Sequence, residues 1–324
     1  MAVRIQAATS AVVLAAFLGL PGTAARADEG GVSFWLPGQL GSLTAVPGEP
    51  GWSMPMLYIH TDVDAGGERT FTRGGRLVAG LDARADLGLV VPTYTFAQPV
   101  WGGQAAFGIG IGGGHMKDGI HGSLTAPGGV VVSGEVGDSR TGFTDLYPMA
   151  TVKWNRGTSN YMAYLAGGVP VGAYTQGRLA NLGTNHWSVD AGGGYTYLNP
   201  KEKLEFSAVA GLTYNFENPD TNYKNGIDGH IDWGASYFVS PTMHTGLVGY
   251  FYHQFTGDSG DGARLGDFKS RVNAVGPQVG WFFEGGGKKY YANLKALSEF
   301  GAKNRPEGWS AWLSLVVPLG AGKP

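Results

Sequence analysis

The sequence has no cysteine, few charged residues and no long apolar segment after residue 30. Without cysteine the chain lacks the disulfides that many exported domains use, and it lacks thiolate ligands for zinc. No run of 18 or more apolar residues follows residue 30, which excludes a membrane-spanning α-helix there. The formal net charge of −2 offers no basic surface for nucleic acid.

The sequence is rich in glycine and in apolar residues and poor in charged ones. Charged residues make up 15% of the chain against a typical share of about 25%, while 43% is hydrophobic. Glycine accounts for 56 of 324 residues, far above the usual share of roughly 7%. Because glycine permits close strand packing and tight turns but disfavours helices, this composition indicates an all-β protein.

The N-terminus has the pattern of a secretory signal peptide. Arg4 precedes an apolar stretch centred on residues 11–20, and Ala25-Arg26-Ala27 forms a cleavage site of small residues. The stretch is too short for a membrane anchor. We therefore predict a signal peptide over residues 1–27, a separate segment over 28–51 and a folded domain over 52–324.

The folded domain alternates between apolar and polar residues. In 204–217, Leu204, Phe206 and Leu212 fall on one face of a strand, and Glu205 and Thr213 fall on the other. Similar segments occur near 53–62, 87–97, 104–115, 143–154, 160–174, 187–198, 204–217, 227–239, 244–256, 270–283, 289–300 and 309–319. We predict a transmembrane up-and-down antiparallel β-barrel of about 12 strands. A soluble β-sandwich is the alternative.

The linkers between these segments are sorted by length. Short linkers alternate with long ones, which include 63–86, 116–142 and 257–269. Outer-membrane barrels have short periplasmic turns and longer external loops, whereas a sandwich has no reason to sort its loops in this way. The pattern therefore favours the barrel and predicts the bacterial outer membrane as its location.

Residues 28–51 are too rich in glycine and proline for a regular strand or helix. They carry the apolar cluster Phe34, Trp35 and Leu36, which is unfavourable in water and could be buried in a barrel mouth. One interpretation is a plug that gates a hydrophobic solute. The other is a flexible periplasmic leader.

Polar residues on the strands are expected to face the lumen, because a charge at mid-membrane depth on the lipid face costs about 2–4 kcal/mol. This set leans acidic, so a continuous path would prefer neutral or cationic solutes. The alternative is that these groups pair with one another and fill a closed interior. The predicted pore-lining residues are Asp145, Lys153, Asp190, Glu205, Glu217, Asp228, His230, Asp232, Lys295 and Glu299.

Four arginines, Arg69, Arg73, Arg76 and Arg84, fall in the first long linker. Arginine suits planar recognition of phosphates and carboxylates. The linker could contact lipopolysaccharide phosphates, capture aromatic acids at the mouth, or be an ordinary solvated loop.

Several phrases of the sequence are similar to one known family. They are SFWLPGQLGS at 33–42, AVPGEPGW at 45–52, FTDLYP at 143–148, NFENPDTNY at 215–223, GPQVG at 276–280 and NRPEGW at 304–309. Together they resemble the phenol meta-degradation pathway family of outer-membrane proteins. The resemblance implies a barrel similar to hydrophobic-compound channels, admitting small and often aromatic molecules. The expected partners are such a solute, outer-membrane lipid and the barrel assembly machinery.

Two other functional classes remain open. His121 and Ser123 have the spacing found in barrel phospholipases, although they precede a Gly/Pro stretch. A structural or adhesive barrel would depend instead on the long loops. Asp220, Asn222 and Asp228, or Asp258, Asp261 and Asp267, could hold Ca²⁺, but ordinary turn chemistry explains them equally well. We predict a passive channel without a cofactor, a metal or an enzymatic activity.

Overall fold

The computed structural model describes residues 34–65, 70–73, 76–79, 81–125, 131–263 and 268–320. Regular structure in these residues consists of β-strands, and no helix among them is long and apolar enough to cross a membrane. The strands are β1 Gly51–Asp64, β2 Thr70–Arg73, β3 Arg76–Ala79, β4 Leu81–Val90, β5 Thr93–Val100, β6 Gly103–Thr125, β7 Val131–Phe143, β8 Tyr147–Arg156, β9 Ser159–Gly168, β10 Ser188–Asn199, β11 Leu204–Asn215, β12 Asp228–Ser240, β13 Met243–Gln254, β14 Arg271–Gly285, β15 Lys288–Lys303 and β16 Glu307–Gly320.

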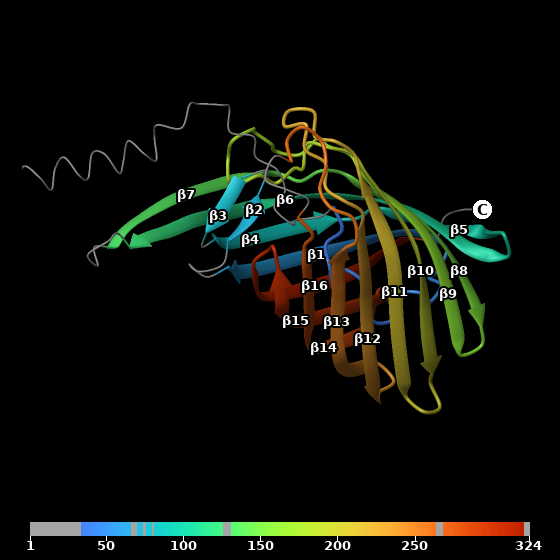
Figure 1. Ribbon diagram of the computed structural model, residues 1–324. Coiled ribbons are helices and arrows are strands. Elements are labelled where there is room, and N and C mark those ends of the chain that lie inside the picture. Colours follow the sequence, from blue (N-terminus) through green and yellow to red (C-terminus); the bar gives the residue numbers. More distant parts are fainter. Residues whose placement is uncertain are drawn as a thin grey trace, which may run out of the picture.

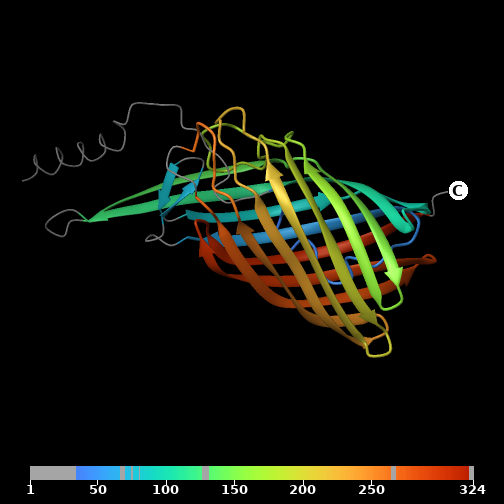
Figure 2. The same ribbon diagram turned by 45° about the vertical axis from the view of Figure 1, so that its right-hand side comes forward.

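Apart from β2 and β3, which form a separate two-stranded sheet, the strands form one closed antiparallel barrel (Figures 1 and 2). Neighbours pair in sequence order, and β16 returns to pair with β1 from Trp52 opposite Gly320 to Asp64 opposite Glu307. Both β4 and β5 pair with β1 and β6, so they form one barrel strand that is interrupted at 91–92. In the same way β7 and β8 share the partner β6, which leaves 12 barrel strands, as predicted.

The interruption between β4 and β5 has a local cause. Pro92 has no N–H group with which to continue the ladder. The neighbouring Val91 N–H instead donates to the carbonyl of Pro55 at 2.8 Å. The predicted segment 87–97 therefore spans two strands rather than one.

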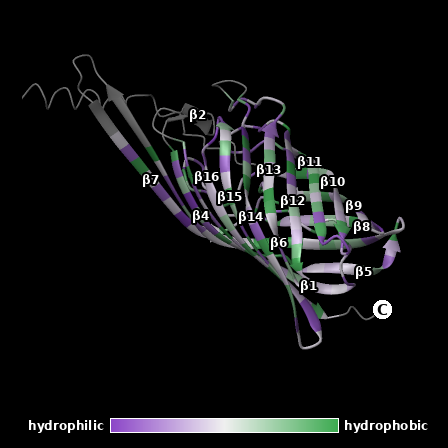
Figure 3. Ribbon diagram, turned by 90° about the horizontal axis from the view of Figure 1, so that it is seen from below, coloured by the Kyte–Doolittle hydropathy of each residue, from purple (hydrophilic) through white to green (hydrophobic). Residues whose placement is uncertain are grey.

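The barrel wall is polar inside and apolar outside along most strands. In β11, Glu205, Ser207 and Thr213 are buried, whereas Phe206 and Leu212 are exposed. This inversion of a soluble fold is expected when lipid, rather than water, surrounds the wall. The hydropathy colours alternate along the strands accordingly (Figure 3).

The turns differ at the two ends of the barrel. The tight connections at 101–102, 157–158, 200–203, 241–242 and 286–287 lie at the end where β1 begins and β16 ends. The long connections lie at the opposite end, which we call the loop end. Two predicted loops were wrong in part. Linker 63–86 contains the β2–β3 hairpin and β4, and linker 116–142 is largely the extension of β6 and β7, a hairpin that projects beyond the barrel (Figure 1).

Residues 34–50, which we call the inner segment, lie within the barrel (Figure 2, blue). They lead from β1 at the tight-turn end into the lumen, and Phe34, Trp35 and Ala45 are buried there. Trp35 and Phe34 join the inward residues Met162, Tyr164 and Val209 in one apolar cluster. The inner segment therefore serves as a core for a barrel whose own side chains do not fill it.

Candidate functional site: the occupied lumen and its cavity

The wall holds the inner segment mainly through its main chain. Gly38 N and Leu40 N donate to the two carboxylate oxygens of Asp232 at 2.8 and 3.1 Å. Leu43 N donates to Glu205 Oε1 at 2.9 Å, and Ala45 N donates to Thr196 Oγ1 at 3.1 Å. Each N–H bond to a charged acceptor contributes about 1.5–3 kcal/mol, so this ladder of side chains fixes the path of the segment.

Two lysines complement these carboxylates. Lys295 Nζ donates to the carbonyl of Gly38, and Lys153 Nζ donates to that of Val46 at 3.3 Å. Asp232 thus accepts from the N–H group of Gly38, and Lys295 donates to the carbonyl group of the same residue. Lys295 also lies 4.9 Å from the ring centre of Trp312, which stabilises a buried ammonium.

The apolar end of the inner segment packs on aromatic and polar wall residues. The Trp35 ring stacks on His230 with centroids 3.8 Å apart, and its centroid is 5.6 Å from that of Tyr164. Beneath Trp35, His230 Nε2 and Asp190 Oδ2 lie 3.0 Å apart with both side chains fully buried. This buried pair orients the imidazole as a flat platform for the indole.

The predicted pore-lining residues divide into several roles. Asp190, Glu205, His230, Asp232, Lys153 and Lys295 meet the inner segment or the platform beneath it, as above. Asp228 accepts from Asn215 Nδ2 at 2.8 Å, a contact between neighbouring strands. Glu217 lies beyond the end of β11 and is exposed, because the strand ends at Asn215, two residues earlier than predicted. Asp145 and Glu299 lie near the loop end.

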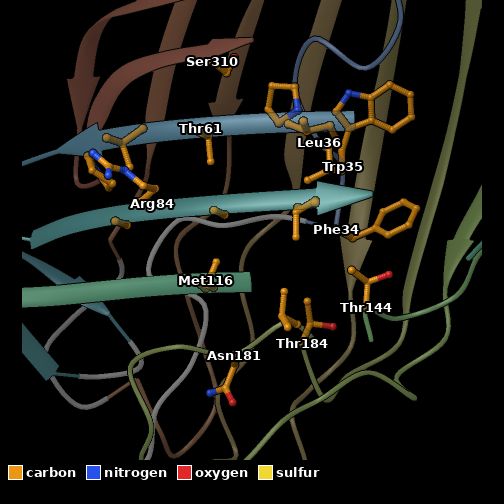
Figure 4. A pocket seen from close by; sticks show the side chains of 18 of the residues that line it. Phe34, Trp35, Leu36, Thr61, Arg84, Met116, Thr144, Asn181, Thr184 and Ser310 are labelled. Carbon is orange, nitrogen blue, oxygen red and sulfur yellow. The ribbon is translucent and has the colours of Figure 1, made fainter. Parts of the chain in front are cut away.

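A cavity of about 250 Å³ lies in the lumen between the inner segment and the loop end (Figure 4). Phe34, Trp35 and Leu36 close it on one side, while Asn181 and Thr184 face it from the connection 169–187. Its wall is mostly apolar and is formed by inward residues of β1, β4 and β16, chiefly Ile59, Leu81, Ala85, Leu87, Leu89 and Trp312.

The connection 169–187 is folded over the cavity by two carboxylates. Asp145 accepts from Gly172 N and Thr184 N, both at 2.8 Å. Asp138 on β7 pairs with Arg178, which also lowers the pKa of Asp138 to about 2. The covering connection is therefore anchored at both halves, and Asp145 acts as its anchor rather than as an open pore group.

In the loop-end half of β1 and β4, the distribution of polar and apolar side chains between the two faces is the reverse of that in the wall elsewhere. Their apolar residues face the cavity, while Asp62 and Arg84 face outward and pair with each other, with Arg84 Nε 3.0 Å from Asp62 Oδ2. Next to them Tyr58 Oη donates to Asp86 at 2.6 Å. The outer face thus changes from apolar to charged near Tyr58, which marks where the apolar band ends on these strands.

The arginines predicted to act together are separated. Arg84 belongs to β4 and is paired, so it is not part of a loop. Arg73 and Arg76 are opposite each other in the β2–β3 hairpin, and Arg69 lies outside the described residues. His121 and Ser123 are on β6 opposite Glu135 and Ser133, within the hairpin extension that sequence reasoning treated as an irregular loop.

The loop carboxylates weighed as Ca²⁺ ligands make ordinary contacts. Asp258 Oδ1 accepts from Gln254 Nε2 at 2.6 Å and from Gly226 N at 3.3 Å. Asp267 lies outside the described residues. Across the part of the chain that the structure describes, no group of three or more His, Asp or Glu residues is arranged to hold a metal ion.

Sequence reasoning found Phe34, Trp35, Leu36 and Glu299 but missed most of the apolar wall of the cavity. Leu81, Ala83 and Ala85 of β4 alternate with polar residues, yet they were placed in the linker 63–86. Arg305 was noted only as part of the phrase NRPEGW. The signal that could have found it is a cationic residue that follows glycine and asparagine in a short connection. Gly301 and Asn304 both adopt left-handed backbone conformations, with φ of 69° and 56°.

The fold and lumen define an outer-membrane-type β-barrel with an internal segment and an enclosed cavity. A family model described as "Putative MetA-pathway of phenol degradation" matches residues 66–315, and the chain belongs to this family. No curated protein matches the sequence.

Solved structures with a similar fold include the COG4313 outer membrane channel from Pseudomonas putida F1. That match has a TM-score of 0.67 and 16% identity, and it covers 87% of this chain and 99% of the other. A FadL homologue from Pseudomonas aeruginosa matches with a TM-score of 0.41 and 10% identity over 92% of this chain and 96% of its own.

Proposed function

We propose that this protein is an outer-membrane channel for the passive uptake of small hydrophobic or aromatic compounds. The observation that carries the proposal is the cavity of about 250 Å³ with its apolar wall on β1, β4 and β16. Pockets for drug-sized ligands usually measure about 300–1,000 Å³, so this one suits a smaller, single-ring solute. The family description, which refers to phenol degradation, agrees with that class of solute.

The inner segment is proposed to act as the plug of this channel. It occupies the lumen on the tight-turn side of the cavity through hydrogen bonds to Asp232, Glu205 and Thr196. A solute in the cavity would contact Phe34, Trp35 and Leu36 directly. Displacement of these three residues would then couple solute binding to opening.

Export by the predicted signal peptide at residues 1–27 and insertion by the barrel assembly machinery are part of the same proposal. Asp62, Arg84 and Asp86 form a charged outer face on the loop-end side of Tyr58. This face is suited to the polar region of lipopolysaccharide. Neither a cofactor nor a source of energy is needed, because the solute would move down its own gradient.

The test is the permeability of liposomes that contain the purified protein. The panel should contain a small sugar, phenol and toluene, and protein-free liposomes give the background rate. We expect the two aromatic solutes to enter faster than in the background, with saturation, and the sugar to be excluded. Equal entry of all three solutes would instead indicate a general porin. Background rates throughout would refute channel function.

A further inference from the structure

Arg178 and Arg305 line the cavity from the connections that bound it, and their ionic environments differ. Arg178 is paired with Asp138, while Arg84 at the cavity margin is paired with Asp62 on the outer face. Arg305, in the connection between β15 and β16, has no ion-pair partner among the described residues. Its Nε and Nη1 atoms are buried without a hydrogen-bond acceptor, and its guanidinium lies 4.9 Å from the ring centre of Tyr252.

The backbone of the connection directs Arg305 inward. Gly301 and Asn304 both adopt left-handed conformations, with φ of 69° and 56°. Asn304 Nδ2 donates to the carbonyl of Lys269 at 2.9 Å, and Ala302 N donates to Glu307 Oε2 at 2.9 Å. These contacts fix the turn, so the next residues, Arg305 and Pro306, reach the cavity wall.

Glu299, the acidic group in the cavity lining, forms no ion pair with Arg305 among the described residues. Its Oε2 accepts from Gly308 N at 3.0 Å and its Oε1 accepts from the Tyr250 hydroxyl. The predicted acidic lumen residues Asp232 and Glu205 are bound to the inner segment instead. The cavity lining therefore combines an apolar wall with one arginine whose Nε and Nη1 donors lack an acceptor. These two atoms are covered by protein atoms, so a carboxylate reaches them only when the Arg305 side chain shifts.

We propose that the cavity binds small aromatic carboxylates, with the ring against the apolar wall and the carboxylate on Arg305. A guanidinium with unfilled donors in apolar surroundings is strongly under-solvated, and a carboxylate is its best-matched partner. This inference names the solute class of the proposed channel and rests on that function for transport, although binding itself does not require transport. It replaces the preference for neutral or cationic solutes expected from the sequence.

Binding should be measured by calorimetry on the intact protein in nanodiscs, with benzoate, benzyl alcohol and benzylamine as matched probes. We expect benzoate to bind at least tenfold more tightly than the other two. Arg305→Gln should abolish that preference, so that benzoate and benzyl alcohol bind with similar affinity, whereas Arg305→Lys should retain part of it. Arg156→Gln removes the same charge at an exposed site of the tight-turn end and should behave as the wild type.

Several results would overturn the inference. Wild-type protein that does not prefer benzoate would do so, as would an equal loss of all probes in Arg305→Gln when Arg305→Lys restores none of them. Circular dichroism and heat-modifiable migration of each variant identify a misfolded barrel, in which case Arg305→Lys alone decides between the outcomes. Entry of phenol into liposomes without benzoate preference would refute this inference and leave the channel intact. Benzoate binding without entry of any aromatic solute would refute the channel alone.

Discussion

The two sides of the lumen use opposite chemistry. The wall formed by β10, β11 and β12 faces inward with Thr196, Glu205 and Asp232, and it is filled by the inner segment. The wall formed by β1, β4 and β16 faces inward with residues such as Ile59, Leu89 and Trp312, and a cavity remains in front of it. Polar groups in a closed lumen need partners, which the chain's own main chain supplies, while an apolar surface can remain open to a guest.

Removing the inner segment should have the largest effect, because it leaves the polar wall without its partner. In a variant lacking residues 34–46, we expect water to replace the segment and a small sugar to enter liposomes about tenfold faster or more, as wider water-filled barrels allow. Replacement of the same residues by a glycine/serine linker of equal length is the control for chain length. Unchanged sugar exclusion in the deletion variant would show that the loop end alone closes the channel.

Asp232→Ala should release the inner segment without shortening it. The change removes the acceptor for Gly38 N and Leu40 N, and each donor left buried without a partner costs about 1–3 kcal/mol. Since the chain has no cysteine, Ala45→Cys provides a single reporter at a fully buried position. We expect maleimide to label it much faster in the Asp232→Ala background.

The matched control for that experiment is Asp220→Ala, which removes a carboxylate from an exposed loop position. Its labelling rate should equal that of the parent protein with Ala45→Cys alone. Slow labelling in both backgrounds would mean that the remaining contacts, such as those of Glu205 and Thr196, are sufficient to hold the segment.

A polar group on the apolar side should reduce uptake of hydrophobic solutes. Leu87→Asn places an amide in the cavity wall, and displacing its hydration costs about 1–3 kcal/mol, or roughly a tenfold loss of toluene uptake. Thr61→Val is the complementary change of nearly equal size and should leave uptake equal or higher. The same loss in both variants would argue against an apolar binding surface on β1 and β4.

Acid should weaken the cover of the cavity only at very low pH. Arg178 lowers the pKa of Asp138 from 3.8 to about 2, so the pair stabilises the folded state above pH 4 and loses this contribution as the pH falls toward 2. The pair is partly exposed, so the effect is at most about 1 kcal/mol. The exchange rate of amides 172–184, divided by the rate of an unstructured chain at the same pH, should rise between pH 4 and 2 in wild type. In Asp138→Asn this relative rate should already be high at pH 4.

Much of the barrel could be predicted from the sequence because alternation reports strands directly. The predicted ranges matching β9 to β16 carry apolar residues that face lipid, and the short turns between them follow from length alone. The prediction failed at the start of β4. Residues 81–87 alternate strictly, but alternation defines two faces without saying which one faces the lumen, and on β4 the apolar face is the inner one.

The cavity could not be predicted for a related reason. Its apolar wall comes from β1, β4 and β16, while other lining residues come from the inner segment, several further strands and the connections. Only the closure of β16 onto β1 brings the apolar wall together. Arg305 depends on a turn with two left-handed residues, which sequence spacing does not reveal. The inner segment could be suspected from Phe34, Trp35 and Leu36, but its route was set by acceptors scattered over β10 to β12.

The contacts that hold the inner segment also determine which of its positions are free to vary. Leu40, Leu43 and Ala45 donate through their amide groups, which every residue except proline possesses. Gly38 differs, since its φ is 86° and a Cβ there would come within 2.8 Å of the Leu297 side chain. Where the contact is made through the main chain alone, the barrel recognises a polypeptide rather than a sequence. Ser42 is a second exception, since its hydroxyl group bonds to Ser236 and Gln278. In evolutionary terms, drift is open at the positions held only by their amide groups and with room for a side chain, while Gly38, Ser42, the aromatic end and the wall acceptors must be kept.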